Sequence, residues 1–199
     1  MYNSRKMKSV TFITRVFVIA VATMLISGCS SGSIKYRNYQ ADTSYVVKVA
    51  VLPFNNLGGD KFAPERVRTM FIVDMMSRNR WDIVEQGEVT KVLGQILRAS
   101  GAVEGGVIEL NNESLKLLGE RLGVQAVVVG SVNEYVGRGT NEISIATKMM
   151  DTASGVVLWQ AVTSIPANTP IRAFFGMEPP IRSVLTKKVV RKAVNSMPK

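Results

Sequence analysis

Three apolar segments joined by two short turns place the strongest constraint on the fold of this 199-residue chain. The segments are AVVVGSVNEYV (126–136), EISIATKMMD (142–151) and VVLWQAV (156–162), and each is rich in residues that favour strands. The turns between them, GRGTN and TASG, are short and contain glycine, which is typical of β-hairpins. The sequence therefore predicts an antiparallel meander of three strands.

In the rest of the chain, segments whose apolar residues have the spacing of strands alternate with segments whose apolar residues have the spacing of helices. Residues 46–54 (VVKVAVLPF) form a nearly continuous apolar run, which predicts a strand buried on both faces. A second strand is predicted at 80–85, and apolar residues at helical spacing follow each of these strands and recur on both sides of the meander. Asn112 is a predicted N-cap and Gly123 a predicted helix stop. The order βαβααβββα predicts a single α+β domain over 46–199, a mixed sheet with flanking helices.

The start of the chain has the pattern of a signal peptide. Four basic residues precede or border an uncharged apolar run at 16–26, and the first acidic residue is Asp42. The run is shorter than the roughly 20 residues of a spanning helix. Residues 26–29 (ISGC) are similar to the lipobox of bacterial lipoproteins, which implies cleavage after residue 28 and acylation of Cys29. The alternatives are an uncleaved anchor, or a cytosolic protein whose lone cysteine packs as a small apolar residue.

The residues after the cysteine indicate the destination of such a lipoprotein. Ser30 stands where lipoproteins retained in the inner membrane usually have aspartate, so the resemblance implies an outer-membrane lipoprotein facing the periplasm. Its membrane contact would be the acyl chains on Cys29. Residues 30–45 are polar and lack apolar periodicity. We therefore expect 29–45 to be a lipidated N-terminus and tether that reaches at most about 50 Å.

The composition of the mature chain excludes several kinds of catalytic and binding site. Four of the 25 Lys and Arg residues lie in the leader, and the other 21 against 15 Asp and Glu give +6, which weakens a nucleic-acid interpretation. The chain has no histidine, which excludes Ser/His/Asp and Cys/His catalysis and histidine-bearing zinc sites. The loop NNLGGDK lacks the spacing of a phosphate-binding loop, and the glutamates near loops fit a solvated surface. We expect no enzymatic activity, no cofactor and no metal.

Four segments in a fixed order after the lipobox carry a family resemblance: KVAVLPF, RWDIVEQGEVTKVLGQIL, LGERLGVQAVVVGSVNEY and DTASGVVLW. They resemble the CsgG family, lipoproteins that form the curli secretion channel, and the similarity covers about 46–162. The wider group contains LpoB-type lipoproteins, which activate penicillin-binding proteins. CsgG channels cross the outer membrane through two hairpins, but the matching sites here are too short (137–141) or broken by prolines (164–180). The resemblance thus implies the periplasmic domain without its pore, still able to form a homo-oligomeric ring.

Two groups of residues are candidates for contact with a partner. Phe174 and Phe175 are adjacent in the proline-rich link, and in an extended segment they cannot face the same way, so we expect one to be exposed. On the last predicted helix, 181–197, one face is basic, and it is either solvated or meets anionic lipid or an acidic partner; its residues are Lys187, Lys188, Arg191 and Lys192. Three methionines are expected to pack in the core: Met149, Met150 and Met177.

The leading hypothesis is a non-enzymatic outer-membrane lipoprotein that serves as an assembly or accessory subunit of an envelope secretion or surface-appendage system. Its envelope protein partner is not identified by the sequence. The alternative is an LpoB-like activator of a peptidoglycan synthase, against which the short tether counts, because such an activator must reach through the cell wall. An enzyme is the third hypothesis and has the least support.

Overall fold

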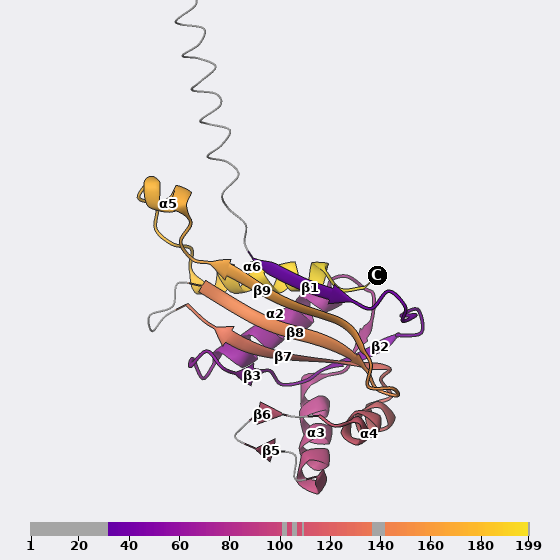
Figure 1. The fold of residues 1–199 in the computed structure, drawn as a ribbon. Coiled ribbons are helices and arrows are strands. Elements are labelled where there is room, and N and C mark those ends of the chain that lie inside the picture. Colours follow the sequence, from indigo (N-terminus) through magenta and orange to yellow (C-terminus); the bar gives the residue numbers. More distant parts are fainter. Residues whose placement is uncertain (1–31, 101–102, 105–106, 109, 137–141, 199) are drawn as a thin grey trace, which may run out of the picture. The chain divides into compact units, whose positions relative to one another are not determined.

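A mixed sheet of seven strands organises the part of the chain that the computed structural model describes, residues 32–100, 103–104, 107–108, 110–136 and 142–198 (Figure 1). The predicted signal peptide, Cys29 and the first hairpin site at 137–141 lie outside these residues. The sheet has the order β1-β9-β8-β7-β2-β4, with β3 paired to β7. Its strands are β1 (Ser33–Arg37), β2 (Lys48–Val51), β3 (Asn55–Asn56), β4 (Asp82–Ile83), β7 (Ala126–Glu134), β8 (Glu142–Asp151) and β9 (Val157–Pro166).

Helices and one small hairpin complete the described elements. The helices are α2 (Ala63–Met76), α3 (Gln86–Ser100), α4 (Asn112–Leu122), α5 (Pro170–Phe174) and α6 (Arg182–Asn195). The hairpin pairs β5 (Val103–Glu104) with β6 (Val107–Ile108). The fold is α+β, as predicted, and none of the described helices is long and apolar enough to cross a membrane.

The predicted meander forms the centre of the sheet. Strands β7, β8 and β9 pair antiparallel in sequence order, while β2 pairs parallel with both β7 and β4, so the sheet is mixed. The middle of β2 is buried on both faces, because Val49, Ala50 and Val51 are all inaccessible to solvent. Helix α2 covers one face of this strand and α3 the other, which is why its sequence is continuously apolar.

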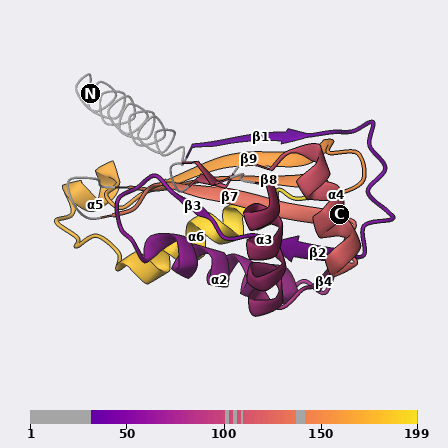
Figure 2. The same ribbon diagram turned by 90° about the horizontal axis from the view of Figure 1, so that it is seen from below.

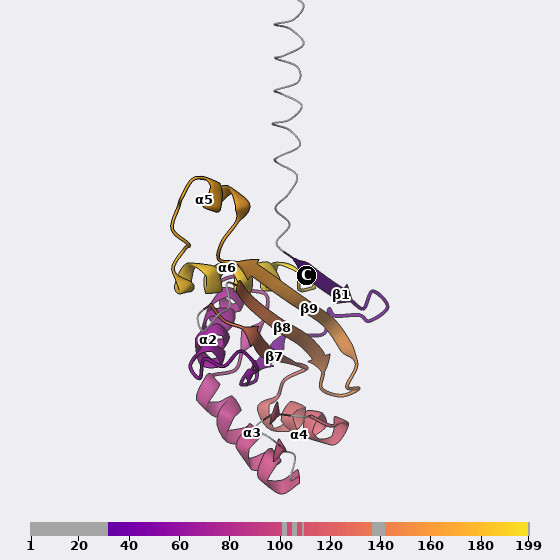
Figure 3. The same ribbon diagram turned by 60° about the vertical axis from the view of Figure 1, so that its left-hand side comes forward.

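One face of the sheet is covered by α2 and α6 (Figure 3). Trp159 of β9 is fully buried under α6 and donates its indole N–H to Ser196 Oγ at 3.2 Å. The predicted apolar arc of the last helix lies in this core: Leu185, Val189, Val190, Ala193, Val194 and Met197. The helix itself is shorter than predicted, since it begins at Arg182 and ends at Asn195.

The opposite face is covered by α3 and α4 at the β2–β7 side of the sheet (Figure 2). Both helices have side-chain caps that the local sequence supplies. Glu85 Oε2 accepts the backbone N–H of Glu88 at 2.9 Å, and N–H groups of the first turn of α3 lower the pKa of Glu85. For α4 the cap is Asn111 rather than the predicted Asn112, and the helix ends at Gly123, whose φ is 63°.

The structure corrects the predicted tether. Residues 33–37 form the edge strand β1, paired antiparallel with β9, and Ser164 N–H donates to the Gly32 carbonyl at 3.0 Å. All five residues of β1 are exposed, so the segment has no alternation of buried and exposed side chains that would reveal a strand. Backbone pairing with β9 stabilises it instead. Only residues 30 and 31 lie between Cys29 and Gly32, so the α-carbons of Cys29 and Gly32 are at most about 11 Å apart.

Candidate functional site: an exposed apolar arm

Residues 168–181, here called the α5 arm, connect β9 to α6 and stand clear of the sheet (Figures 1 and 3). Within this segment α5 forms one and a half turns of helix, and none of its residues is buried. The segment was predicted as an extended proline-rich link, and this is wrong for residues 170–174. Because no residue of α5 is buried, hydrogen bonds within the α5 arm must define much of its shape.

Local hydrogen bonds cap the helix α5 at both ends. Thr169 is the N-cap, accepting Arg172 N–H at 3.4 Å, and Pro170 occupies the first turn, where no N–H partner is needed. At the other end Gly176 N–H donates to Ala173 O and Met177 N–H to Arg172 O, at 3.2 and 2.9 Å. This pair of bonds is a Schellman motif, and it requires the left-handed φ of 62° that Gly176 adopts.

The side chains that the α5 arm presents to solvent are largely apolar. Phe174 is 84% and Phe175 67% exposed, and their rings meet edge to face with centroids 5.2 Å apart. Both phenylalanines are therefore exposed, whereas an extended segment would have exposed one. Met177 is also exposed, against its predicted packing, while Met149 and Met150 are buried as predicted. Two further large apolar residues of the α5 arm are exposed: Ile171 and Ile181.

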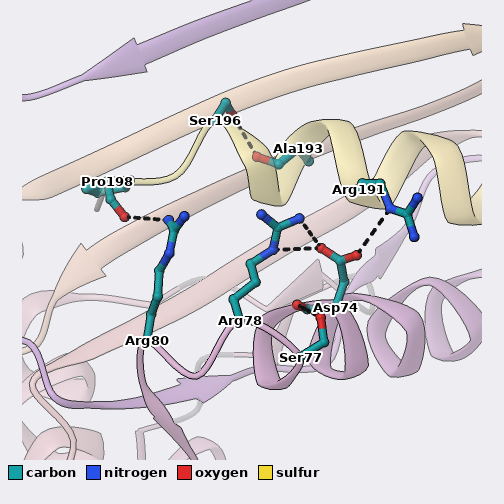
Figure 4. Close-up of polar contacts among 8 residues, drawn as sticks. All are labelled: Asp74, Ser77, Arg78, Arg80, Arg191, Ala193, Ser196 and Pro198. Atoms are coloured by element: carbon teal, nitrogen blue, oxygen red, sulfur yellow. Dashed lines mark hydrogen bonds and ion pairs between the residues drawn. The ribbon is translucent and has the colours of Figure 1, made fainter.

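The basic face of α6 divides into residues with different roles. Lys187 and Lys188 are exposed to solvent, and Lys192 is half-buried. Arg191 instead approaches Asp74 of α2, with Nε and Oδ1 3.8 Å apart (Figure 4). The same carboxylate accepts two bonds from Arg78, at 2.7 and 3.0 Å.

This cluster holds α6 against α2. Asp74 lies between two guanidinium groups and is only 15% exposed, so it joins the two helices that cover one face of the sheet. Nearby, Arg80 Nη1 donates to the carbonyl of Pro198, which links the last described residue to the segment between α2 and β4 (Figure 4). Arg191 therefore has a structural contact in the chain itself. Helical periodicity could not separate it from its lysine neighbours, because the partner comes from a helix more than 100 residues earlier.

Two grooves lie on the described surface. One, of about 470 Å³, lies over β7 and β8, and its polar lining residues are amides, hydroxyls and a lysine: Asn55, Ser131, Thr147, Lys148 and Gln160. The other, of about 420 Å³, borders the NNLGGDK loop, where Asp60 faces Arg66 at 3.7 Å and Arg182 at 3.8 Å. Among the described residues no group of three or more Cys, Asp and Glu side chains is placed to hold a metal ion.

No protein-family model and no curated protein sequence matches the chain. Its structure, however, is similar to that of a PelC dodecamer from Paraburkholderia phytofirmans, with a TM-score of 0.53, 13% identity, and coverage of 84% of this chain and 99% of that one. The chain shares the PelC fold.

Two further solved structures are more distant. Lipoprotein GNA1162 from Neisseria meningitidis is 18% identical over 76% of this chain and 99% of its own, with a TM-score of 0.47. The C-terminal domain of LpoB from Salmonella enterica is 14% identical over 64% of this chain and 88% of its own, with a TM-score of 0.46. At these scores neither adds to the conclusion from PelC, which concerns the fold alone.

Proposed function

We propose that the mature chain is a non-enzymatic outer-membrane lipoprotein of CsgG-like type, lipidated at Cys29 on the periplasmic face. In this proposal it is an assembly or accessory subunit of an envelope secretion or surface-appendage system. The observation that carries the proposal is the α5 arm, an ordered element that keeps two adjacent phenylalanines in solvent. Such a surface is costly in a protein with nothing to contact, and it marks a site of interaction.

The fold supports an assembling subunit. PelC, whose fold the chain shares, is a dodecamer in its crystal structure. A closed ring of this chain would place every α5 arm at one level, because symmetry repeats each surface at equal height. A ring of lipoproteins would in this way form a collar at the membrane.

The short anchor supports a role at the membrane surface over the LpoB-like alternative. Gly32 is already held in the sheet through Ser164, and only two residues, Ser30 and Ser31, separate it from Cys29. The reach of about 11 Å from Cys29 to Gly32 leaves the domain beside the membrane, whereas an activator of a peptidoglycan synthase must extend into the cell wall.

Crosslinking in cells tests the proposal. A photoreactive amino acid replaces Lys187, an exposed residue of α6, and Ala153 in the β8–β9 turn serves as the matched exposed control. Capture of an export or appendage component, or of a second copy, at 187 and not at 153 supports the proposal. Capture of a peptidoglycan synthase favours the alternative. Capture of neither, together with a monomeric lipidated protein in mild detergent, would overturn the assembly role.

A further inference from the structure

We propose that the α5 arm is a second membrane contact, which inserts its apolar side chains into the same bilayer leaflet as the acyl chains on Cys29. This inference rests on the proposed lipidation. It concerns a different property, namely what occupies the exposed apolar surface and how the domain stands on the membrane.

The sheet brings Gly32, three positions after the predicted lipid site, and the α5 arm to the same end of the described domain. Ser33, the first residue of β1, pairs with Thr163 of β9, and Ser164 donates to Gly32. Strand β9 ends at Pro166 and α5 begins at Pro170. All three ribbon views place α5 beyond the end of the sheet at which β1 begins (Figures 1, 2 and 3).

Chain length then fixes the distance from the membrane. An acylated cysteine lies at the membrane surface, and the α-carbons of Cys29 and Gly32 are at most about 11 Å apart. The sheet end formed by Gly32 and Ser164 is held within that distance. Apolar groups of interfacial helices are typically buried about 5–10 Å into the boundary between headgroups and acyl chains, so the α5 arm needs only to lean toward the surface.

The chemistry of the α5 arm fits a lipid surface. Its exposed large side chains are Ile171, Phe174, Phe175, Met177 and Ile181, which suit the acyl boundary. Its charges are few: Arg172, whose guanidinium donates to the carbonyl of Glu178 at 2.9 Å, and Glu178 itself. At the base of the α5 arm, Arg182 is half-exposed and can meet anionic headgroups.

The two contacts reinforce each other. Once Cys29 holds the chain at the bilayer, insertion of the α5 arm becomes intramolecular, so a weak intrinsic affinity is sufficient. A single point of attachment would leave the domain free to rotate over the surface. Two contacts at one end of the sheet define which face points away from the membrane, as subunits of a ring require.

Spin labels on the lipidated protein test the proposal. Cys29 is the only cysteine, and its thiol is consumed by acylation, so Phe174→Cys introduces one reactive site. The control is Ala153→Cys, at the opposite end of β9. Each variant is reconstituted in vesicles of phosphatidylethanolamine with a minority of phosphatidylglycerol. Accessibility of the label to oxygen, which partitions into lipid, is compared with accessibility to a water-soluble nickel chelate.

We expect the label at 174 to be several-fold more accessible to oxygen than to nickel, with the reverse at 153. Ile171→Ser together with Phe175→Ser should move the label at 174 toward the aqueous pattern. A label at 174 as accessible to nickel as that at 153 would overturn the proposal, and so would shielding from both reagents, which would mean that a second copy covers the α5 arm. Intact mass measured beforehand reports the acyl chains, so a failure of lipidation is seen separately from a failure of insertion.

Discussion

Tyr45 and Asp151 form a hydrogen bond that should make stability depend on pH at both extremes. Tyr45 Oη donates to Asp151 Oδ2 at 2.7 Å. Burial and the carboxylate raise the pKa of Tyr45 to about 12. Burial also acts to raise the pKa of Asp151, but hydrogen bonds from Ser154 and Tyr45 outweigh it and lower that pKa below 3.8.

The directions of these two pKa shifts determine how stability should depend on pH. The tyrosine contributes stability that is full below pH 10.0 and is lost as pH rises toward 12. The aspartate contributes stability that is present above pH 3.8 and is lost as pH falls through its lowered pKa. Tyr45→Phe should cost about 1 kcal/mol at pH 7 and flatten the alkaline loss. Urea unfolding at pH 7 and pH 11 measures both, and an unchanged alkaline slope in the variant would contradict the assignment.

Replacement of Thr163 should stabilise the protein. It is fully buried in β9, and its hydroxyl has no hydrogen-bond partner within the described structure. Thr163→Val keeps the shape and removes the unsatisfied group, so the free energy of unfolding should rise by up to about 1 kcal/mol. The matched control is Thr186→Val, equally buried but bonded to Tyr135 Oη at 3.2 Å and Arg182 O at 2.8 Å. That variant should lose about 1 kcal/mol or more; equal effects at both positions would refute the explanation.

At the scale of elements, the α5 arm should unfold independently of the core. Gly176→Ala forces a left-handed residue to carry a side chain, although no atom lies within 4 Å of the new Cβ. We expect the Schellman closure to open while the midpoint of global unfolding stays unchanged, because α5 buries nothing. Limited chymotrypsin digestion should then cleave faster at Phe174 and Phe175. Gly123→Ala, at the end of α4 with a φ of 63°, should instead lower global stability by about 1 kcal/mol.

The individual elements show which parts of the fold can be predicted from the sequence. The meander, α3 and α4 were predictable because buried residues recur at the period of their own secondary structure, as Val89, Leu93 and Ile96 do in α3. Strand β1 was not, because its side chains are all exposed and its pairing with β9 is a tertiary contact. Strand β4 is two residues long, shorter than the predicted 80–85.

The candidate site was predictable only in part. Adjacent phenylalanines among prolines indicated exposure, but the α5 helix was missed because the prolines were interpreted as breakers. Thr169 before Pro170, and Gly176 after Phe175, were capping signals that could have revealed it. The pairing of Arg191 with Asp74 depends on how α6 crosses α2, and no local pattern contains that.

At the scale of the whole molecule, lipidation should decide location without affecting the fold. Cys29 lies outside the described domain, so Cys29→Ser should leave the domain folded. Serine cannot form the thioether, and the chain should remain an unacylated, unprocessed precursor. Metabolic labelling with a radioactive fatty acid, together with membrane fractionation, measures this. Label in the variant equal to that in the wild type would remove the lipoprotein assignment.

The length of the anchor segment makes a final prediction about where the partner lies. About 20 Gly and Ser residues inserted between Ser30 and Gly32 would extend the anchor by about 25 Å on average, while β1 still pairs with β9. If the partner lies at the membrane surface, the insertion lowers the effective concentration of the domain near that partner. Crosslinking from position 187 should then fall several-fold. A partner within the cell wall predicts the opposite, since a longer anchor reaches it more easily. An insertion after Ala153, in the turn between β8 and β9, controls for added length without added reach, and it should leave the crosslink unchanged. Increased capture of a peptidoglycan synthase by the long-anchor variant would transfer support to the activator role, because the short anchor would then be a restraint on that contact.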